Sequence, residues 1–182
     1  MLKYEIDQAH THIGFTAKHL AVSTVHGRFN KFEGGFESPD DDYTKTRGEV
    51  KVELASLESQ SDQRDTHLRS ADFFDVEKYP YMTFKLTSIE PVDEENFKVT
   101  GDLTIKEITK PVVLEATIEG RLPDPFGGKE RVGISARGQI NRKDWGLTFD
   151  GLAGTVPFAS NTIKLEIDAE IVVKLGELAQ AS

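Results

Sequence analysis

The feature that most limits how this chain can fold is the strict alternation of apolar and polar residues in its long segments. In NTIKLEIDAEIVVKL, residues 161–175, every second residue from Ile163 is apolar, and those between are mostly charged. Because successive side chains of a strand point to opposite faces, this pattern predicts a strand with one buried face. The same pattern occurs at 50–54, 82–86, 103–105, 112–118 and 132–140. Such alternation is typical of antiparallel strands, since parallel strands under helices give continuous apolar runs.

The connecting segments have the composition of turns. They carry Pro, Gly, Asp and Asn, which favour turn conformations: SPDDDYTKTRG (38–48), PVDEEN (91–96), TK before Pro111, and LPDPFGGKE (122–130). The sequence shows no linker, low-complexity segment or internal repeat. We therefore expect a single domain over residues 1–182.

The length of the strands predicts how the sheet ends. The last alternating run, of about 14 residues, would span roughly 45 Å at about 3.3 Å per residue. Long antiparallel strands with one apolar face would expose their edges in a flat sheet, and closing into a barrel removes those edges. A barrel of seven or eight strands is either filled by its own side chains or holds one small ligand. The residues alone leave both possibilities open.

Charge and composition exclude several kinds of function. The chain has 31 acidic and 22 basic residues, a net charge of -9, so a nucleic-acid groove or a basic membrane-surface patch has little support. The absence of cysteine excludes disulfides, thiol catalysis and cysteine-bound metals. The N-terminal MLKYEIDQAH lacks the apolar core of a secretion signal, and no run approaches the roughly 20 apolar residues of a membrane span. The expected location is cytoplasmic, or periplasmic or secreted if a signal has been removed.

One polar segment interrupts the strands. SQSDQRDTHLRSADFF, residues 59–74, begins with Ser59 three residues before Asp62, a spacing similar to a capping box. Leu68 is its only large apolar residue before Phe73 and Phe74. A helix with so narrow an apolar contact suits a barrel rim, so we expect a short rim helix near 60–70, with the two phenylalanines at the mouth.

The sequence resembles the YceI-like family, a lipocalin-like group of bacterial polyisoprenoid-binding and lipid-binding barrels. The resemblance rests on HTHIGFTAKHLAVSTVHGRF (10–29), RDTHLRSADFFDVEKYPYMTFK (64–85), GDLTIKEITKPVVL (101–114) and ARGQINRKDWGL (136–147). It implies a single antiparallel barrel of about eight strands around an apolar tunnel for an isoprenoid quinone, a polyprenyl pyrophosphate or a similar amphiphile. A homodimer is also plausible from the family. Two positions depart from its usual glycines, Ala21 and Glu107.

An apolar tunnel would be lined by residues in phase with the inward faces, and the alternative is an ordinary close-packed core. Small residues in the same phase, Ala17, Ala116, Gly138 and Ala169, would leave room for a ligand. The candidate lining residues are Ile13, Phe15, Phe29, Phe36, Phe73, Phe74, Phe84, Leu86, Leu103, Ile105, Leu114, Ile134, Phe149 and Leu165.

The polar head group of such a ligand requires hydrogen-bond donors at the mouth. Candidates are Lys18, His19, Arg28, His67, Arg69, Arg142 and Lys143. His67 and Arg69 come first because they fall in the expected rim helix. The alternative is that these side chains only balance nearby carboxylates at the surface.

Metal binding and catalysis have weaker support. His10 and His12 would share one side of a strand, but such a pair alone is a weak metal signal, and no metal or other cofactor is predicted. The sequence contains no G-x-S-x-G, P-loop, G-x-G-x-x-G or H-E-x-x-H motif. We therefore expect a binding protein without turnover. The alternatives are a small hydrolase or isomerase acting on a lipid in the same cavity, and a dry barrel serving as a stress or interaction module.

Trp145, the only tryptophan, leaves two interpretations open. It could shape a second loop over the mouth, or it could close the bottom of the barrel.

Overall fold

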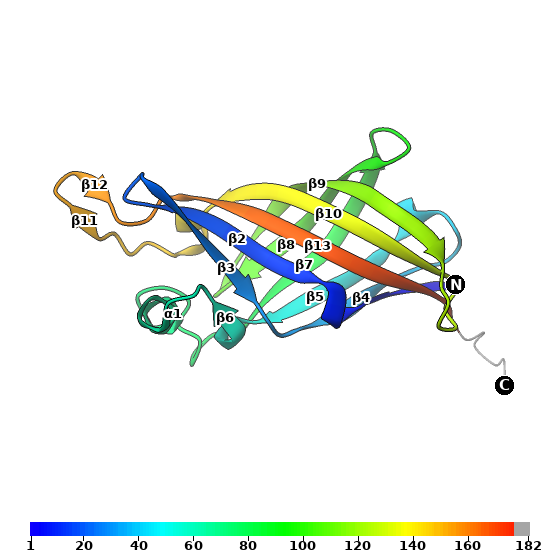
Figure 1. Cartoon of the computed structure of the whole chain (residues 1–182), viewed down its shortest axis with the longest axis horizontal. Helices are drawn as coiled ribbons and strands as arrows, with labels where there is room; N and C mark the ends of the chain where they lie inside the picture. The colour runs from blue at the N-terminus through cyan, green and yellow to red at the C-terminus, as the bar shows by residue number, and fades with distance from the viewer. Residues whose placement is uncertain (177–182) are drawn as a thin grey trace.

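The computed structural model describes residues 1–176 and shows an elongated, closed antiparallel β-barrel (Figure 1). Its strands are β1 (Leu2–Ile6), β2 (His12–His19), β3 (Ser23–Phe29), β4 (Phe32–Ser38), β5 (Arg47–Glu53), β6 (Leu57–Glu58), β7 (Tyr81–Pro91), β8 (Asn96–Ile105), β9 (Ile108–Pro123), β10 (Glu130–Asn141), β11 (Leu152–Ala153), β12 (Val156–Pro157) and β13 (Thr162–Leu175). The helix α1 spans Asp62–Arg69, and short 3₁₀ turns occupy Gln8–His10, Tyr43–Lys45, Leu54–Ser56 and Arg142–Trp145. The last part of the expected domain, 177–182, lies outside the described residues.

The barrel closes through β13. Both β1 and β2 pair with the same edge of β13, at residues 171–175 and 164–168, while β10 pairs with the other edge. The chain continues from β3 into β4 across residues 30–31. The strands β1 and β2 together therefore act as one interrupted strand, and β3 and β4 act as another. With β5, β7, β8, β9, β10 and β13 they form an eight-stranded closed barrel, which confirms the expected fold class.

The wall is incomplete at one end of the barrel. There one edge of β3 pairs with β2, but its other edge has only the short β6, because β5 ends at Glu53 and β7 begins at Tyr81. Residues 54–80 fill this gap and carry α1 (Figure 1). Leu54 and Leu57 are almost completely buried beneath it. The expected rim helix is therefore present, and it belongs to a segment that completes the wall.

Two local expectations need correction. The N-cap of α1 is Ser61, whose hydroxyl accepts a hydrogen bond from the Arg64 amide, and not Ser59. Ser59 is buried and its hydroxyl donates to the carboxylate of Asp65, which is also buried. Ser59 therefore forms a buried hydrogen-bonded pair and does not cap the helix. The expected turn before Pro111 lies earlier, at 106–107, and Pro111 is inside β9.

Pro111 is tolerated in β9 because of its position on the strand. Its neighbour in β8 is Asp102, while the pairing of β9 with β10 begins only at Glu115 and Arg137. This part of β9 therefore has one unpaired edge, where the missing N–H of proline costs no ladder hydrogen bond.

Trp145 packs against the wall at the same end of the barrel as α1. Its side chain is buried, and its indole N–H donates to the carbonyl of Leu103 at 2.9 Å. It also contributes to a polar depression where β9 and β10 diverge, together with Pro111 and Gly138. The tryptophan thus seals the flank of the barrel and does not line its interior.

Candidate functional site

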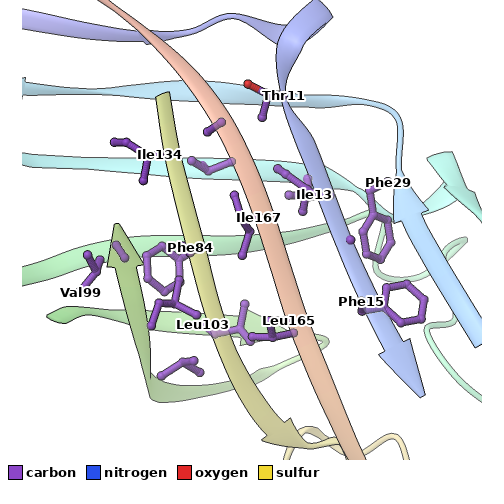
Figure 2. A pocket seen from close by; sticks show the side chains of 18 of the residues that line it. Thr11, Ile13, Phe15, Phe29, Phe84, Val99, Leu103, Ile134, Leu165 and Ile167 are labelled. Carbon is purple, nitrogen blue, oxygen red and sulfur yellow. The ribbon is translucent and has the colours of Figure 1, made fainter. Parts of the chain in front are cut away.

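The barrel encloses an apolar cavity of about 720 Å³, lined by residues from one end to the other. Its volume falls within the range of about 300–1,000 Å³ typical of small-molecule sites. Figure 2 shows side chains of β2, β7, β8, β10 and β13, including Ile13, Phe84 and Ile167, pointing toward this space. Several of them are only half-buried although they face inward, because part of their surface borders the cavity. The interior is therefore hollow and not close-packed.

The alternating pattern located the lining well. Every predicted tunnel residue except Phe149 borders the cavity. Phe149 is 37 % exposed and contacts His67 edge to face and Phe73 at a tilt, with ring centroids 4.9 and 5.3 Å away. It follows the 3₁₀ turn after β10, where the period of two no longer determines which way a side chain points. Phe73 and Phe74 are buried in the lining behind α1.

Three of the four small residues predicted to leave room, Ala17, Ala116 and Ala169, also border the cavity. Gly138 has a different role. A Cβ at this position would lie 2.7 Å from Cδ2 of Leu114, so the glycine allows close packing of the wall.

Two further glycines shape the cavity and were not found from the sequence. A Cβ on Gly27 would lie 2.3 Å from the ring of Phe15, and one on Gly101 would lie 2.3 Å from the ring of Phe84. Each phenylalanine ring thus lies flat over a glycine of the neighbouring strand. This arrangement keeps large aromatic rings against the wall and leaves the centre open. The pairing of Phe15 with Gly27 depends on strand register, which the sequence pattern does not provide.

Polar side chains border the cavity near α1. They are Lys18, His19, Arg64 and Arg142. Lys18 and His19 are exposed at the end of β2, and the ammonium of Lys18 donates to the hydroxyl of Thr24 at 2.8 Å. Arg64 was not among the predicted residues; it donates to Ser59 from the first turn of α1.

Arg142 is buried and serves mainly as a structural residue. Its guanidinium donates to the carbonyls of Leu147, Phe149 and Ser160 and pairs with Asp150 at 3.0 Å. It therefore holds together the long connection between β10 and β13. Nearby Lys143 pairs with Asp150 at 2.6 Å, outside the lining, and these partners hold the pKa of the Asp150 carboxyl below its usual value.

The other predicted head-group residues lie outside the cavity lining. Arg28 points outward from β3 and pairs with Glu58 at 3.4 Å, because its neighbours in the strand, Gly27 and Phe29, take the inward positions. His67 is exposed and bonds to Asp72 at 2.9 Å. Arg69 donates to the carbonyls of Leu57 and Ala55, which fastens α1 to the gap-filling segment. Arg28, His67 and Arg69 thus form their hydrogen bonds or ion pairs outside the cavity. The basic side chains that border the cavity at this end are Lys18, His19, Arg64 and Arg142.

The opposite end of the cavity also has polar groups, which the sequence did not reveal. Tyr4 borders it, and burial, followed by the nearby carboxylate of Asp41, raises the pKa of its phenol. The phenol therefore stays protonated at neutral pH. Lys129 and Asp41 form an ion pair at 2.6 Å that joins the loop before β10 to the loop after β4. Only the fold brings these loops together, so local sequence carried no signal.

The expectation that His10 and His12 share one side of a strand is wrong. His10 lies in the 3₁₀ turn before β2, so it does not share a strand face with His12. His10 instead lies near the carboxylates of Asp7 and Glu170. Arg131 already donates to both carboxylates, so this group is a charge-compensated network at the barrel surface.

The chain matches the YceI-like domain family over residues 4–171. It is 39 % identical over 149 residues to Protein YceI of Escherichia coli, a match covering 81 % of this chain and 77 % of that protein. The chain belongs to the YceI-like family, as its sequence motifs indicated.

Solved structures agree with this fold. The YceI protein of Campylobacter jejuni superposes with a TM-score of 0.72 at 36 % identity, covering 90 % of this chain and 94 % of that one. A polyisoprenoid-binding domain from Saccharophagus degradans superposes with a TM-score of 0.69 at 15 % identity, covering 94 % and 99 %. At that identity the second likeness concerns the fold alone. The described residues of our chain contain no helix long and apolar enough to cross a membrane.

Proposed function

We propose that this protein binds a long-chain isoprenoid, or a similar amphiphile with a long apolar tail, inside its barrel, and sequesters or carries it without chemical turnover. The observation that carries this proposal is the apolar cavity, which extends along the barrel and holds about 720 Å³. Its elongated shape and apolar wall suit a chain of prenyl units better than a compact polar molecule. Family membership and the polyisoprenoid-binding neighbour support the same ligand class.

The energetics of burial favour such a ligand. Removing several hundred Å² of prenyl surface from water at about 25 cal/mol/Å² gives on the order of 10 kcal/mol, before ordering costs are subtracted. Affinity would therefore come mainly from the tail. Lys18 and His19 border the cavity near α1 and offer donors to a quinone carbonyl or a pyrophosphate. We place the head group at this end.

The direct test is native mass spectrometry of freshly purified protein, followed by organic extraction of any bound lipid. A stoichiometric prenyl or acyl species recovered unchanged supports carriage, whereas a chemically altered product indicates catalysis. The proposal would be contradicted by a protein that is purified without bound lipid and then binds none of three added ligands: a long-chain ubiquinone, a polyprenyl pyrophosphate and a fatty amide. That result would favour a barrel that holds no ligand.

A pair of variants links the binding to the cavity. The double substitution Phe15→Asp, Phe84→Asp places two carboxylates on the apolar wall, and we expect uptake of ubiquinone to fall at least tenfold. Phe126→Asp is the matched control, because Phe126 is 81 % exposed and does not border the cavity. Equal uptake by the folded double variant and this control would exclude the assigned cavity as the binding site.

A further inference from the structure

Two loops project beyond the α1 end of the barrel and expose apolar side chains. One is the turn between β2 and β3, and the other carries β11 and β12 (Figure 1). We call their exposed apolar residues the hairpin surface: Val22, Leu152, Val156 and Phe158, which are 84 %, 58 %, 38 % and 45 % exposed. Four large apolar side chains grouped at one end of a barrel have no role in its core.

The two loops are held together as one unit. The amide of Leu20 donates to the carbonyl of Phe158 at 3.2 Å, and that of Ser160 donates to the carbonyl of Lys18 at 3.0 Å. A β-bridge joins His19 to Ala159 between these contacts. The hairpin surface is therefore built on paired backbone and has a defined geometry.

This surface is continuous with the cavity. Phe158 belongs to it and also borders the cavity, as do the neighbouring Ala159, Lys18 and His19. An apolar path thus leads from the inner wall of the barrel to the tips of the loops. A lipid tail moving along this path would stay in contact with apolar side chains.

Charge distinguishes this end from the opposite one. The segments 17–24 and 151–161 contain no Asp or Glu, although the chain has 31 of them in 182 residues. The opposite end also exposes apolar residues, Val92 and Phe126 among them, but they lie close to the acidic runs 40–42 and 93–95 and to Asp124. For a chain of net charge -9, the tips of these two loops can meet an anionic surface without a carboxylate of their own, although the neighbouring α1 segment carries the exposed Asp62, Asp72 and Glu77.

We propose that the hairpin surface docks on a lipid bilayer, with Val22 and Leu152 entering the boundary between head groups and acyl chains. Lys18 and His19 would then lie at the level of the lipid head groups. This inference rests on the proposed function, because it specifies where an isoprenoid carrier exchanges its ligand. With the mouth on the bilayer, the tail enters the barrel without crossing water.

The absence of native cysteine makes a site-specific test simple. Val22→Cys and Phe126→Cys place a polarity-sensitive fluorophore at opposite ends of the barrel, at positions that are 84 % and 81 % exposed. The probe vesicles contain phosphatidylcholine with a minority of phosphatidylglycerol. We expect a blue shift and intensity gain for the Val22 label alone. No shift at Val22, or equal shifts at both positions, would overturn the proposed orientation.

A second measurement separates docking from ligand binding. Val22→Asp with Leu152→Asp should weaken vesicle partitioning at least tenfold, while loading of ubiquinone from detergent micelles stays unchanged, since neither residue borders the cavity. The control Val92→Asp with Phe126→Asp should partition like the wild type. The milder pair Val22→Ser, Leu152→Ser serves if the first fails to fold.

The outcomes distinguish the two proposals. Normal loading from micelles with unchanged partitioning of the hairpin variant overturns the docking inference alone. If the wild type takes up no lipid from micelles, the proposed function fails, whatever the vesicles show. If light scattering shows that the hairpin substitutions only dissociate a dimer and leave vesicle partitioning unchanged, the surface is an interface between two copies and the bilayer proposal is wrong.

Discussion

At the scale of single residues, backbone conformation explains the two departures from the family's usual glycines. Leu20 and Ala21 both have positive φ, 50° and 55°, and the amide of Val22 donates to the carbonyl of His19. This combination is typical of a type I′ turn, in which glycine is favoured because it lacks a Cβ. At the other departure the positive φ falls on Lys106 and not on Glu107, so of these two replaced glycines Ala21 alone has a backbone conformation that favours glycine.

The strain at Ala21 can be measured. We expect Ala21→Gly to raise the free energy of unfolding by about 0.5–1 kcal/mol, since the left-handed conformation costs an alanine more than a glycine. Chemical denaturation monitored by the fluorescence of Trp145 provides the measurement. Glu107→Gly is the control and should not stabilise the protein. A decrease in stability for Ala21→Gly would contradict the assigned turn.

At the scale of elements, one arginine joins four parts of the chain. Arg131 of β10 pairs with Asp124 in the preceding loop at 2.7 Å, with Asp7 after β1 at 3.0 Å, and with Glu170 of β13. The side chain of Asp124 is only 2 % exposed, so these contacts are poorly screened by water. Hydrogen bonds from Arg131 are the main cause that holds the pKa values of Asp124 and Asp7 below their usual range.

The pH dependence follows from the direction of these shifts. A carboxyl whose pKa is lower in the folded state than its unfolded value of about 3.9 stabilises the protein fully above that value, and the contribution is lost as pH falls through the folded pKa. We expect Arg131→Met to lower the thermal midpoint by several degrees at pH 7 and by much less near pH 2. Arg121→Met is the control, because Arg121 is 56 % exposed and its pair with Glu130 is long, 3.8 Å. A pH-independent difference between wild type and Arg131→Met would refute this linkage.

The same scale shows what the sequence could predict. Alternation in segments such as 161–175 determined which residues face inward, because side-chain direction in a strand follows directly from sequence position. The segment 54–80 has no such rule, since its role is to fill a gap left by the ends of β5 and β7. The sequence therefore predicted α1 but not that Arg69 would bond to backbone carbonyls of this segment, or that His67 would face solvent.

At the scale of the whole molecule, the length of the cavity sets the length of tail that fits. The interior contains a large apolar cluster that extends from Phe73 and Phe74 beside α1 to Phe97 and Ala116, and a smaller one around Leu2, Val132, Ile171 and Val173. Ala169 borders the cavity and packs against the smaller cluster. We infer that its small side chain keeps the passage between these two clusters open, so that one long chain can contact both.

Blocking this passage should shorten the preferred tail. We expect Ala169→Trp to reduce binding of a long-chain ubiquinone at least tenfold, while a short-chain analogue that needs only the part near α1 binds within about twofold of the wild type. The free energy released by each buried prenyl unit is lost when that unit has no wall to contact. Competitive displacement of a fluorescent fatty acid measures both affinities. Leu122→Trp, which adds the same bulk at an exposed position that does not border the cavity, is the control and should affect both ligands little. An equal loss for short and long tails in Ala169→Trp would mean that the two parts of the cavity do not hold the tail in sequence.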